Sequence, residues 1–169
     1  MMRPDIYTVA KIGQGFLAVM AKPVAGEWIA DEFLGIARFG IHCLVSLLEQ
    51  HEIRELGLSS ASALCESNGI AYLHFPIKDR GIPTSSSKAC DVIEDIHGRI
   101  SQGQNTVIHC RAGIGRTGLL AASVLVRDGH SAHAAFGMVS KARGIQVPDT
   151  TEQYEWVVQQ QKALQRRKM

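Results

Sequence analysis

The sequence predicts an α/β fold, in which a central, mostly parallel β-sheet is flanked by helices on both faces. Short apolar runs of strand length alternate along the chain with segments whose apolar residues recur at helical spacing. Several of the runs are apolar at nearly every position, which is typical of strands that are covered on both faces. The 169 residues suit one domain, residues 1–169, with a substantial hydrophobic core.

The first half of the chain is predicted to begin with a hairpin and to continue with alternating helices and strands. Two apolar runs within residues 6–21, separated by glycines, predict a pair of strands. A helix is expected within residues 26–40, because Ile29, Phe33 and Ile36 then share one face. The next elements are a buried strand in residues 41–48, helical turns followed by a helix in residues 51–69, and a strand in residues 70–77.

The second half is predicted to place a buried strand between two helices and to end in two more helices. Ser85, Ser86 and Ser87 offer N-caps for a helix whose isoleucines share one face. The segment NTVIHC, residues 105–110, predicts a strand. The helix that follows it is apolar on nearly every side, so we expect it to be covered all round. The last two helices are expected at residues 131–143 and 150–166.

Charge and hydropathy exclude two classes of partner. The formal net charge of +2 is too small to predict a nucleic-acid-binding surface. The chain has no run of eighteen apolar residues, and its first residues lack the pattern of a secretory signal, so we expect no membrane association. These features together predict a cytosolic protein, which we expect to be a monomer.

The cysteines and histidines do not predict a metal site. Cys43, Cys65, Cys90 and Cys110 lie far apart with no C-x-x-C pair, and the seven histidines show no H-E-x-x-H pattern. We therefore expect reduced thiols, three of which fill the core, and no metal and no cofactor.

The segment VIHCRAGIGRTGLL, residues 107–120, carries the functional signal. It lies between a predicted buried strand and a predicted buried helix, and in open α/β sheets ligands bind at such junctions. Its glycines allow successive backbone N–H groups to point at one centre, next to the positive end of the helix. We expect an anion loop here that binds phosphate, sulfate or vanadate, formed by Arg111, Ala112, Gly113, Ile114, Gly115 and Arg116.

The residues at the two ends of this loop point to phosphoryl chemistry. The segment has neither the lysine of a Walker loop nor the acidic ribose partner of a dinucleotide fingerprint. Instead, Cys110 enters the loop and Arg116 leaves it, so a curled loop brings both over a bound oxyanion. The Arg116 guanidinium offers a planar fork for two phosphate oxygens, and Cys110 lies beneath the phosphorus.

The positive surroundings favour the thiolate form of Cys110, which makes it the predicted nucleophile. Thr117 can donate its hydroxyl to the sulfur and help the thiolate to depart when a phosphoenzyme breaks down. His109 is expected to fix the geometry of the loop through hydrogen bonds rather than to act as a base.

The stretch HCRAGIGRTG, residues 109–118, resembles the H-C-x-x-G-x-G-R-[ST]-G signature of the cysteine-dependent protein tyrosine and dual-specificity phosphatases, with all fixed positions present. Residues 25–58 together with PIKDRGIP, residues 76–83, look most like the compact bacterial and cyclin-dependent-kinase-inhibitor-associated members. The resemblance implies the protein tyrosine phosphatase-like fold and a cysteinyl-phosphate intermediate.

A thiolate attack on a phosphate monoester also needs an acid, because an alkoxide or phenoxide leaves poorly at neutral pH. Asp79 is the best candidate, since it follows a predicted strand in a loop stiffened by prolines, 31 residues before Cys110. The loop resembles the general-acid loop of the compact phosphatases. The alternative is a plain turn, because aspartate is common in turns near glycine.

The water that hydrolyses the intermediate is expected to need a positioning residue. Relatives place a glutamine after the penultimate helix, which makes Gln153 the favoured candidate and Gln146 the second. The structural alternative for Gln153 is a capping box with Thr150.

The resemblance implies a phosphorylated protein or peptide substrate, most of all phosphotyrosine, with phosphoserine and phosphothreonine also open. Phosphoinositide-specific relatives carry lysines inside the loop where this chain has Ala112 and Ile114, which disfavours a polyanionic lipid. A phosphoinositide or other small phosphoester is kept as the alternative substrate. A rhodanese-type sulfurtransferase and a phosphoresidue-binding module are the remaining alternatives. The anion loop of rhodanese-type enzymes does not end in the G-x-G-R-T-G pattern that this chain has. A binding module would need neither Cys110 nor Asp79.

Overall fold

The computed structural model describes residues 3–167, which contain a five-stranded sheet with the strand order β1-β2-β5-β3-β4. β1 pairs antiparallel with β2, and the other neighbouring strands pair parallel. The predicted α/β class is therefore confirmed, with a mixed, mostly parallel sheet. The strands are β1 (Tyr7–Ile12), β2 (Gly15–Met20), β3 (Cys43–Ser46), β4 (Ala71–His74) and β5 (Thr106–His109).

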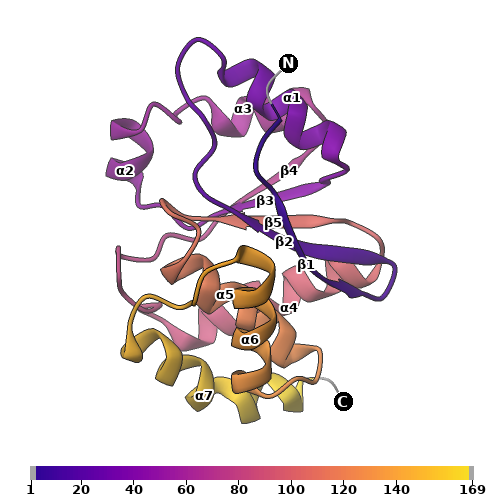
Figure 1. Ribbon diagram of the computed structural model, residues 1–169, viewed down its shortest axis with the longest axis vertical. Helices are drawn as coiled ribbons and strands as arrows, with labels where there is room; N and C mark the ends of the chain where they lie inside the picture. The colour runs from indigo at the N-terminus through magenta and orange to yellow at the C-terminus, as the bar shows by residue number, and fades with distance from the viewer. Residues whose placement is uncertain (1–2, 168–169) are drawn as a thin grey trace.

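Helices cover both faces of the sheet, as the alternating sequence pattern predicts (Figure 1). One face carries α1 (Ile29–Phe39) and α3 (Ala61–Ser67), and the short helix α2 (Gln50–Glu55) joins β3 to α3. The other face carries the second half of the chain. Its helices are α4 (Ser86–Ser101), α5 (Gly115–Arg127), α6 (Ala132–Arg143) and α7 (Thr151–Arg166).

The central strands are buried on both sides because their side chains alternate between two cores. In β2, Leu17 and Val19 pack into the core under α4 to α7, whereas Ala18 and Met20 pack into the core under α1 and α3. Side chains one residue apart point to opposite faces of a strand, so a strand between two helical layers must be apolar throughout. The continuous apolar runs of the sequence reflect this requirement.

The helix α5 runs through the centre of the larger layer. Each of its residues from Gly115 to Arg127 is buried, in agreement with the all-round apolar pattern. It packs against α4, α6 and α7 as well as against the sheet. The helix that begins at the anion loop is therefore held rigidly from every side.

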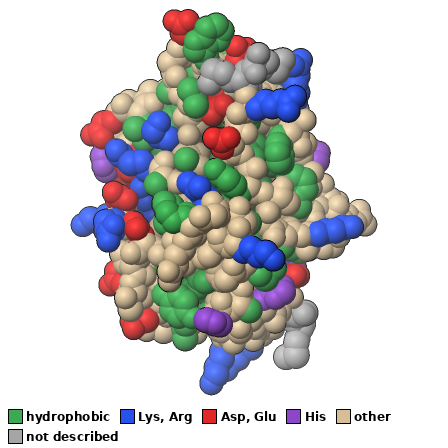
Figure 2. Space-filling view, viewed as in Figure 1, with side chains coloured by type: hydrophobic (Ala, Val, Ile, Leu, Met, Phe, Trp, Pro, Cys, Tyr) green, Lys and Arg blue, Asp and Glu red, His purple; other side chains and the backbone are tan. Residues whose placement is uncertain are grey.

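The surface charges and the helices are the features on which the expectations about partners depend. On the face shown in Figure 2, Lys and Arg side chains are interspersed with Asp and Glu side chains rather than gathered into a stripe of one sign. Within residues 3–167, none of the helices combines the length and the apolar composition needed to cross a bilayer.

The cysteines outside the anion loop fill the core, as predicted. Cys43, Cys65 and Cys90 are free and buried. Burial raises the pKa of the Cys43 thiol to about 11 and that of Cys65 to about 12, and it also raises the pKa of Cys90. These three thiols are therefore protonated at neutral pH and serve as small apolar side chains.

Candidate active site

The candidate site lies at the carboxyl edge of the parallel strands. Two backbone hydrogen bonds extend the ladder past the strand ends, from Leu47 N–H to the His109 carbonyl and from Ile77 N–H to the Leu47 carbonyl, each 3.0 Å long. The segments that follow β3, β4 and β5 therefore meet at one place. This is the strand-to-helix junction at which the sequence predicts an anion loop, residues 110–116.

Two glycines allow the anion loop to pack tightly against its surroundings. Gly113 has a φ of +74°, and a Cβ there would lie 2.6 Å from the Met20 carbonyl oxygen. A Cβ at Gly115 would lie 2.9 Å from the Asp149 Cβ. Any side chain at either position would push the loop away from its neighbours, and Gly113 also needs the left-handed conformation that glycine adopts most easily. Ile114, between them, is the N-cap of α5.

Donors outside the anion loop fix the direction of its peptide groups. The Lys22 N–H donates to the Arg111 carbonyl, and the Arg143 Nη2 donates to the Ala112 carbonyl, both at 3.0 Å. In a planar trans peptide the C=O and the following N–H point in opposite directions. The N–H groups of Ala112 and Gly113 therefore point away from these donors, which is the orientation that an anion site requires.

Arg116 is buried and held by a carboxylate that no local sequence pattern singles out. Its side chain is 1% exposed, and Glu52 in α2 binds both terminal nitrogens, with Oε1 2.7 Å from Nη1 and Oε2 3.1 Å from Nη2. The Nη1 also donates to the Ile77 carbonyl at 3.0 Å. This end-on, bidentate pair fixes the plane of the guanidinium.

The Glu52 carboxyl is a permanent counterion for the loop. Burial alone would raise its pKa, but the hydrogen bond from Arg116, the backbone N–H of Glu49 and the charges of Arg116 and Arg111 lower the pKa to about 2. The Arg111 Nε lies 3.4 Å from Glu52 Oε2. Glu52 therefore stays ionised across the physiological range and restrains both arginines of the anion loop.

The contacts of Arg116 leave one edge of the guanidinium for an oxyanion. Both hydrogens of Nη1 are used by Glu52 and Ile77, and one hydrogen of Nη2 is used by Glu52. The second Nη2 hydrogen points at Asp79, whose Oδ1 is 3.2 Å away. The Nε–H and this Nη2–H form a side-on pair of parallel donors, which matches two oxygens of a phosphate.

Cys110 and Asp79 open into the same small cavity. Its volume is about 210 Å³, and the Asp79 side chain is 62% exposed at its rim. The structure therefore brings together the predicted nucleophile, the predicted acid and the predicted phosphate-binding arginine. The lining residues are Asp79, Arg80, Cys110, Arg111, Ala112, Gly115, Arg116 and Asp149.

His109 and Thr117, which adjoin Cys110 and Arg116 in the sequence, are both buried. The His109 Nδ1 lies 3.0 Å from the Cys110 carbonyl oxygen, so this nitrogen carries the proton and donates it. Burial lowers the pKa of His109 to about 4, so the ring is neutral at physiological pH. Thr117, in the first turn of α5, has a buried hydroxyl with no hydrogen-bond partner among residues 3–167. Its predicted donation to the sulfur stays a prediction.

The two candidate glutamines lie in different places. Gln153 is fully buried and forms the capping box with Thr150, its Oε1 accepting from the N–H groups of Asp149 and Thr150. Its Nε2 donates to the Gly81 carbonyl at 3.1 Å, which ties α7 to the loop that carries Asp79. Gln146 is exposed and lines a neighbouring cavity. The structural alternative for Gln153 is thus observed, and its role in positioning water stays a prediction.

Three residues that shape the site could not be singled out from the sequence: Glu52, Arg143 and Lys22. Glu52 is one of three glutamates between residues 49 and 55, all with similar neighbours. The only local signal is a capping box, in which the Glu49 N–H donates to Glu52 Oε1. Arg143 and Lys22 reach the anion loop through packing of distant segments, which no local pattern reveals.

Comparison with known proteins agrees with this geometry. Residues 18–130 match the model of a family described as "Polymorphic toxin system, DSP-PTPase phosphatase". The chain is also similar to human cyclin-dependent kinase inhibitor 3, with 28% identity over 120 residues. That match covers 70% of this chain and 56% of the human protein, so the chain spans little more than half the length of the curated relative.

Solved structures share the fold over almost the whole chain. The kinase-associated phosphatase with its catalytic cysteine replaced by serine superposes with a TM-score of 0.86 at 22% identity, covering 97% of both chains. Tk-PTP in its active form superposes with a TM-score of 0.75 at 26% identity, covering 93% of this chain and 97% of that one. The family match spans both Asp79 and the complete anion loop. The chain therefore belongs to the DSP-PTPase family, whose members are protein tyrosine and dual-specificity phosphatases.

Proposed function

We propose that this protein hydrolyses phosphate monoesters through a cysteinyl-phosphate on Cys110, and that its substrates are proteins phosphorylated on tyrosine, with phosphoserine and phosphothreonine also accepted. The observation that carries the proposal is the convergence of Cys110, Arg116 and Asp79 on one cavity. Each supplies a different requirement of phosphoryl transfer, namely a nucleophile, a charge clamp and a proton source.

In the first step the Cys110 thiolate attacks phosphorus. The S–P bond forms as the P–O bond to the leaving group breaks, and the Asp79 carboxylic acid gives its proton to the leaving oxygen. The phosphate displaces the Asp79 carboxyl from Arg116 Nη2, because both compete for the same N–H. This exchange frees Asp79 to face the leaving group. Arg116 and the loop amides hold the three non-bridging oxygens throughout.

In the second step water hydrolyses the intermediate. The Asp79 carboxylate takes a proton from the attacking water, the S–P bond breaks, and the electron pair returns to sulfur. Thr117, whose hydroxyl has no hydrogen-bond partner within the described part of the chain, is proposed to donate this hydroxyl to the departing thiolate. The charge of the phosphate is balanced by Arg116 and by the helix terminus, so the residues of the loop meet the electrostatic demand of both steps.

The make-up of the loop favours phosphoproteins over polyanionic lipids. Its interior positions Ala112 and Ile114 carry no charge, and Arg111 is already paired with Glu52. A headgroup with several phosphates would find no further free cation within the anion loop. One phosphate on an amino-acid side chain needs only the single edge of Arg116.

A turnover panel tests the proposal. The substrates are phosphotyrosine, phosphoserine and phosphothreonine peptides, a soluble phosphoinositide and p-nitrophenyl phosphate, with Cys110→Ser as the blank. The proposal predicts release of phosphate from the phosphotyrosine peptides and none from the blank. Turnover of the phosphoinositide alone, or undiminished turnover by Cys110→Ser, would refute it.

A further inference from the structure

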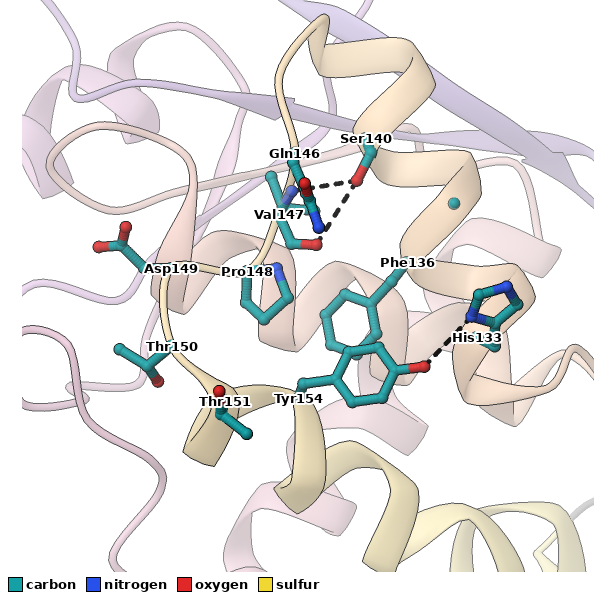
Figure 3. Close-up of a pocket in the computed structure, with 11 residues that line it drawn as sticks. His133, Phe136, Ser140, Gln146, Val147, Pro148, Asp149, Thr150, Thr151 and Tyr154 are labelled. Carbon is teal, nitrogen blue, oxygen red and sulfur yellow. Dashed lines mark hydrogen bonds between the residues drawn. The ribbon is translucent and has the colours of Figure 1, made fainter.

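A second and larger cavity lies beside the catalytic one, between α6 and the start of α7 (Figure 3). Its volume is about 520 Å³, within the usual range for sites that bind organic groups. The residues that line it are His133, Phe136, Gly137, Ser140, Gln146, Val147, Pro148, Asp149, Thr150, Thr151 and Tyr154. We refer to it as the α6–α7 cavity.

The α6–α7 cavity shares a wall with the catalytic cavity. Asp149 lines both, and its side chain is packed so closely on the anion loop that a Cβ on Gly115 would lie 2.9 Å from the Asp149 Cβ. The Asp149 carboxylate points away from the aromatic rings of the cavity (Figure 3) and pairs with Arg80, 3.0 Å away. Arg80 follows Asp79 directly. The two cavities therefore adjoin at Asp149.

The walls of the α6–α7 cavity are suited to an apolar side chain. The Tyr154 ring stacks on Phe136 with a centroid distance of 4.8 Å, and Val147 and Pro148 adjoin them (Figure 3). Gly137 leaves its part of the wall open, because a Cβ there would meet no atom within 4 Å. Aromatic and aliphatic surface with room beside it gains most from burying another apolar group.

Most polar groups around the α6–α7 cavity are already engaged within the protein. The Ser140 hydroxyl accepts from the Val147 N–H at 3.0 Å, and the Thr150 hydroxyl caps α7. The Tyr154 hydroxyl lies 3.3 Å from His133 Nδ1 (Figure 3). A charged ligand would have to break these contacts to be solvated, whereas an apolar side chain leaves them intact.

We propose that the α6–α7 cavity is a specificity subsite, which binds an aromatic or aliphatic side chain close to the phosphoresidue in the substrate polypeptide. The proposal rests on the proposed function, since it assumes a phosphorylated polypeptide as substrate. The shared Asp149 wall is its central support: one chain can place its phosphate on the anion loop and a neighbouring side chain in the cavity. An acyl chain of a phosphorylated lipid is the competing occupant.

The glycine at position 137 allows a test that fills the cavity without removing a contact. Gly137→Ala and Gly137→Leu fill it in two steps, inside a helix where both residues are more favourable than glycine. Gly98→Leu is the matched control, because Gly98 lies inside α4 and a Cβ there also meets nothing within 4 Å. Thermal unfolding of all variants should show that none is less stable than the natural sequence.

The substrates are p-nitrophenyl phosphate and a set of phosphotyrosine peptides in an alanine background, with one leucine or phenylalanine moved through the flanking positions. We expect one position to raise kcat/KM about tenfold over the all-alanine peptide. Gly137→Leu should abolish this gain, Gly137→Ala should reduce it, and Gly98→Leu should keep it. Turnover of p-nitrophenyl phosphate should be the same in all variants.

Four results would overturn the subsite, and they differ in what they mean for the proposed function. Equal turnover of all peptides, or a preference that survives in Gly137→Leu, refutes the subsite and leaves the proposed function intact. Turnover of p-nitrophenyl phosphate without turnover of any peptide refutes both. Slower hydrolysis of a vesicle-borne phosphoinositide by Gly137→Leu, with peptide turnover unchanged, assigns the cavity to an acyl chain instead.

Discussion

Glu52 and Arg116 form a buried, bidentate ion pair in which the two carboxylate oxygens lie 2.7 and 3.1 Å from the two terminal guanidinium nitrogens. The pair links α2 to the first turn of α5 across the carboxyl edge of the sheet. It leaves the Nε edge of Arg116 facing the catalytic cavity. The orientation of Arg116, the proposed phosphate clamp, is therefore set by a residue that lies 58 positions before Cys110.

Glu52→Gln should weaken both catalysis and folding. The amide cannot neutralise Arg116, and breaking a buried ion pair costs about 3 to 5 kcal/mol of unfolding free energy. A misplaced Arg116 should lower kcat/KM for p-nitrophenyl phosphate by on the order of 10²-fold. Steady-state kinetics and urea unfolding measure the two effects.

Glu55→Gln is the matched control, since Glu55 lies in the same helix and meets Arg111 only at 4.0 Å on the surface. This variant should change neither kcat/KM nor the free energy of unfolding. A Glu52→Gln protein with normal kinetics would show that the pair does not orient the clamp.

His109 should make folding stability depend on pH between about 4 and 6.5. Burial lowers its pKa from 6.5 to about 4, so the unfolded chain takes up a proton in this interval and the folded chain does not. The free energy of unfolding therefore falls as the pH falls, by on the order of 3 kcal/mol over the interval. Urea unfolding of the natural protein and of His109→Asn across this range measures the contribution. The stability difference between them should shrink towards pH 4, and a constant difference would contradict the assignment.

Arg143→Met should loosen the anion loop without removing any group that contacts phosphate. The Arg143 guanidinium holds the Ala112 carbonyl and also lies 4.7 Å from the centre of the Tyr7 ring. Its loss frees the Ala112–Gly113 peptide to rotate, so the inhibition constant of vanadate should rise several-fold. Only part of the about 1.5 to 3 kcal/mol of a charge-assisted hydrogen bond should reach vanadate binding, because this contact is exposed. Tyr7→Leu removes only the ring contact and should leave vanadate inhibition unchanged. Arg143→Lys should be inhibited more strongly by vanadate than Arg143→Met, because lysine can replace part of the hydrogen bond. Equal inhibition of Arg143→Met and the natural protein would refute the role.

Asp79→Asn should affect poor leaving groups most. The amide cannot donate the proton that an alkoxide or phenoxide needs, so kcat should fall on the order of 10²-fold or more with phenyl phosphate. With an activated aryl phosphate, whose leaving group departs as the anion, the loss should be much smaller. A series of aryl phosphates of graded leaving-group basicity measures the difference. An equal loss across the series would indicate damage to the site, in which Asp79 serves only as a partner of Arg116.

The sequence predicts those parts of the site that depend on local structure. The anion loop is a continuous segment whose glycines, Cys110 and Arg116 all act within one turn of chain, so its chemistry is visible in the residue pattern. Asp79 could be proposed as the acid because the proposed reaction needs one and a predicted strand places this aspartate at the same sheet edge. The strands and helices follow from periodicity, since burial on one or two faces determines which positions are apolar.

The supporting contacts depend on tertiary packing and are not visible in the pattern. Glu52 faces Arg116 only because α2 folds back over the edge of the sheet, and its neighbours Glu49 and Glu55 look equally suitable in the sequence. Arg143 reaches the anion loop only because α6 ends beside it. Gln153 shows a different limit, because the same residue pattern predicts both a capping box and a residue that positions water. In the structure Gln153 forms the capping box with Thr150.

Trapping the phosphoenzyme tests the proposed mechanism most directly. The natural protein is mixed with an excess of p-nitrophenyl phosphate, quenched in acid within the first turnovers, and the position of any phosphoryl group is mapped by mass spectrometry. A phosphoryl group is expected on the Cys110 sulfur, and none in Cys110→Ser. Steady release of phosphate with no phosphoryl group on Cys110, or with one on another residue, would contradict it.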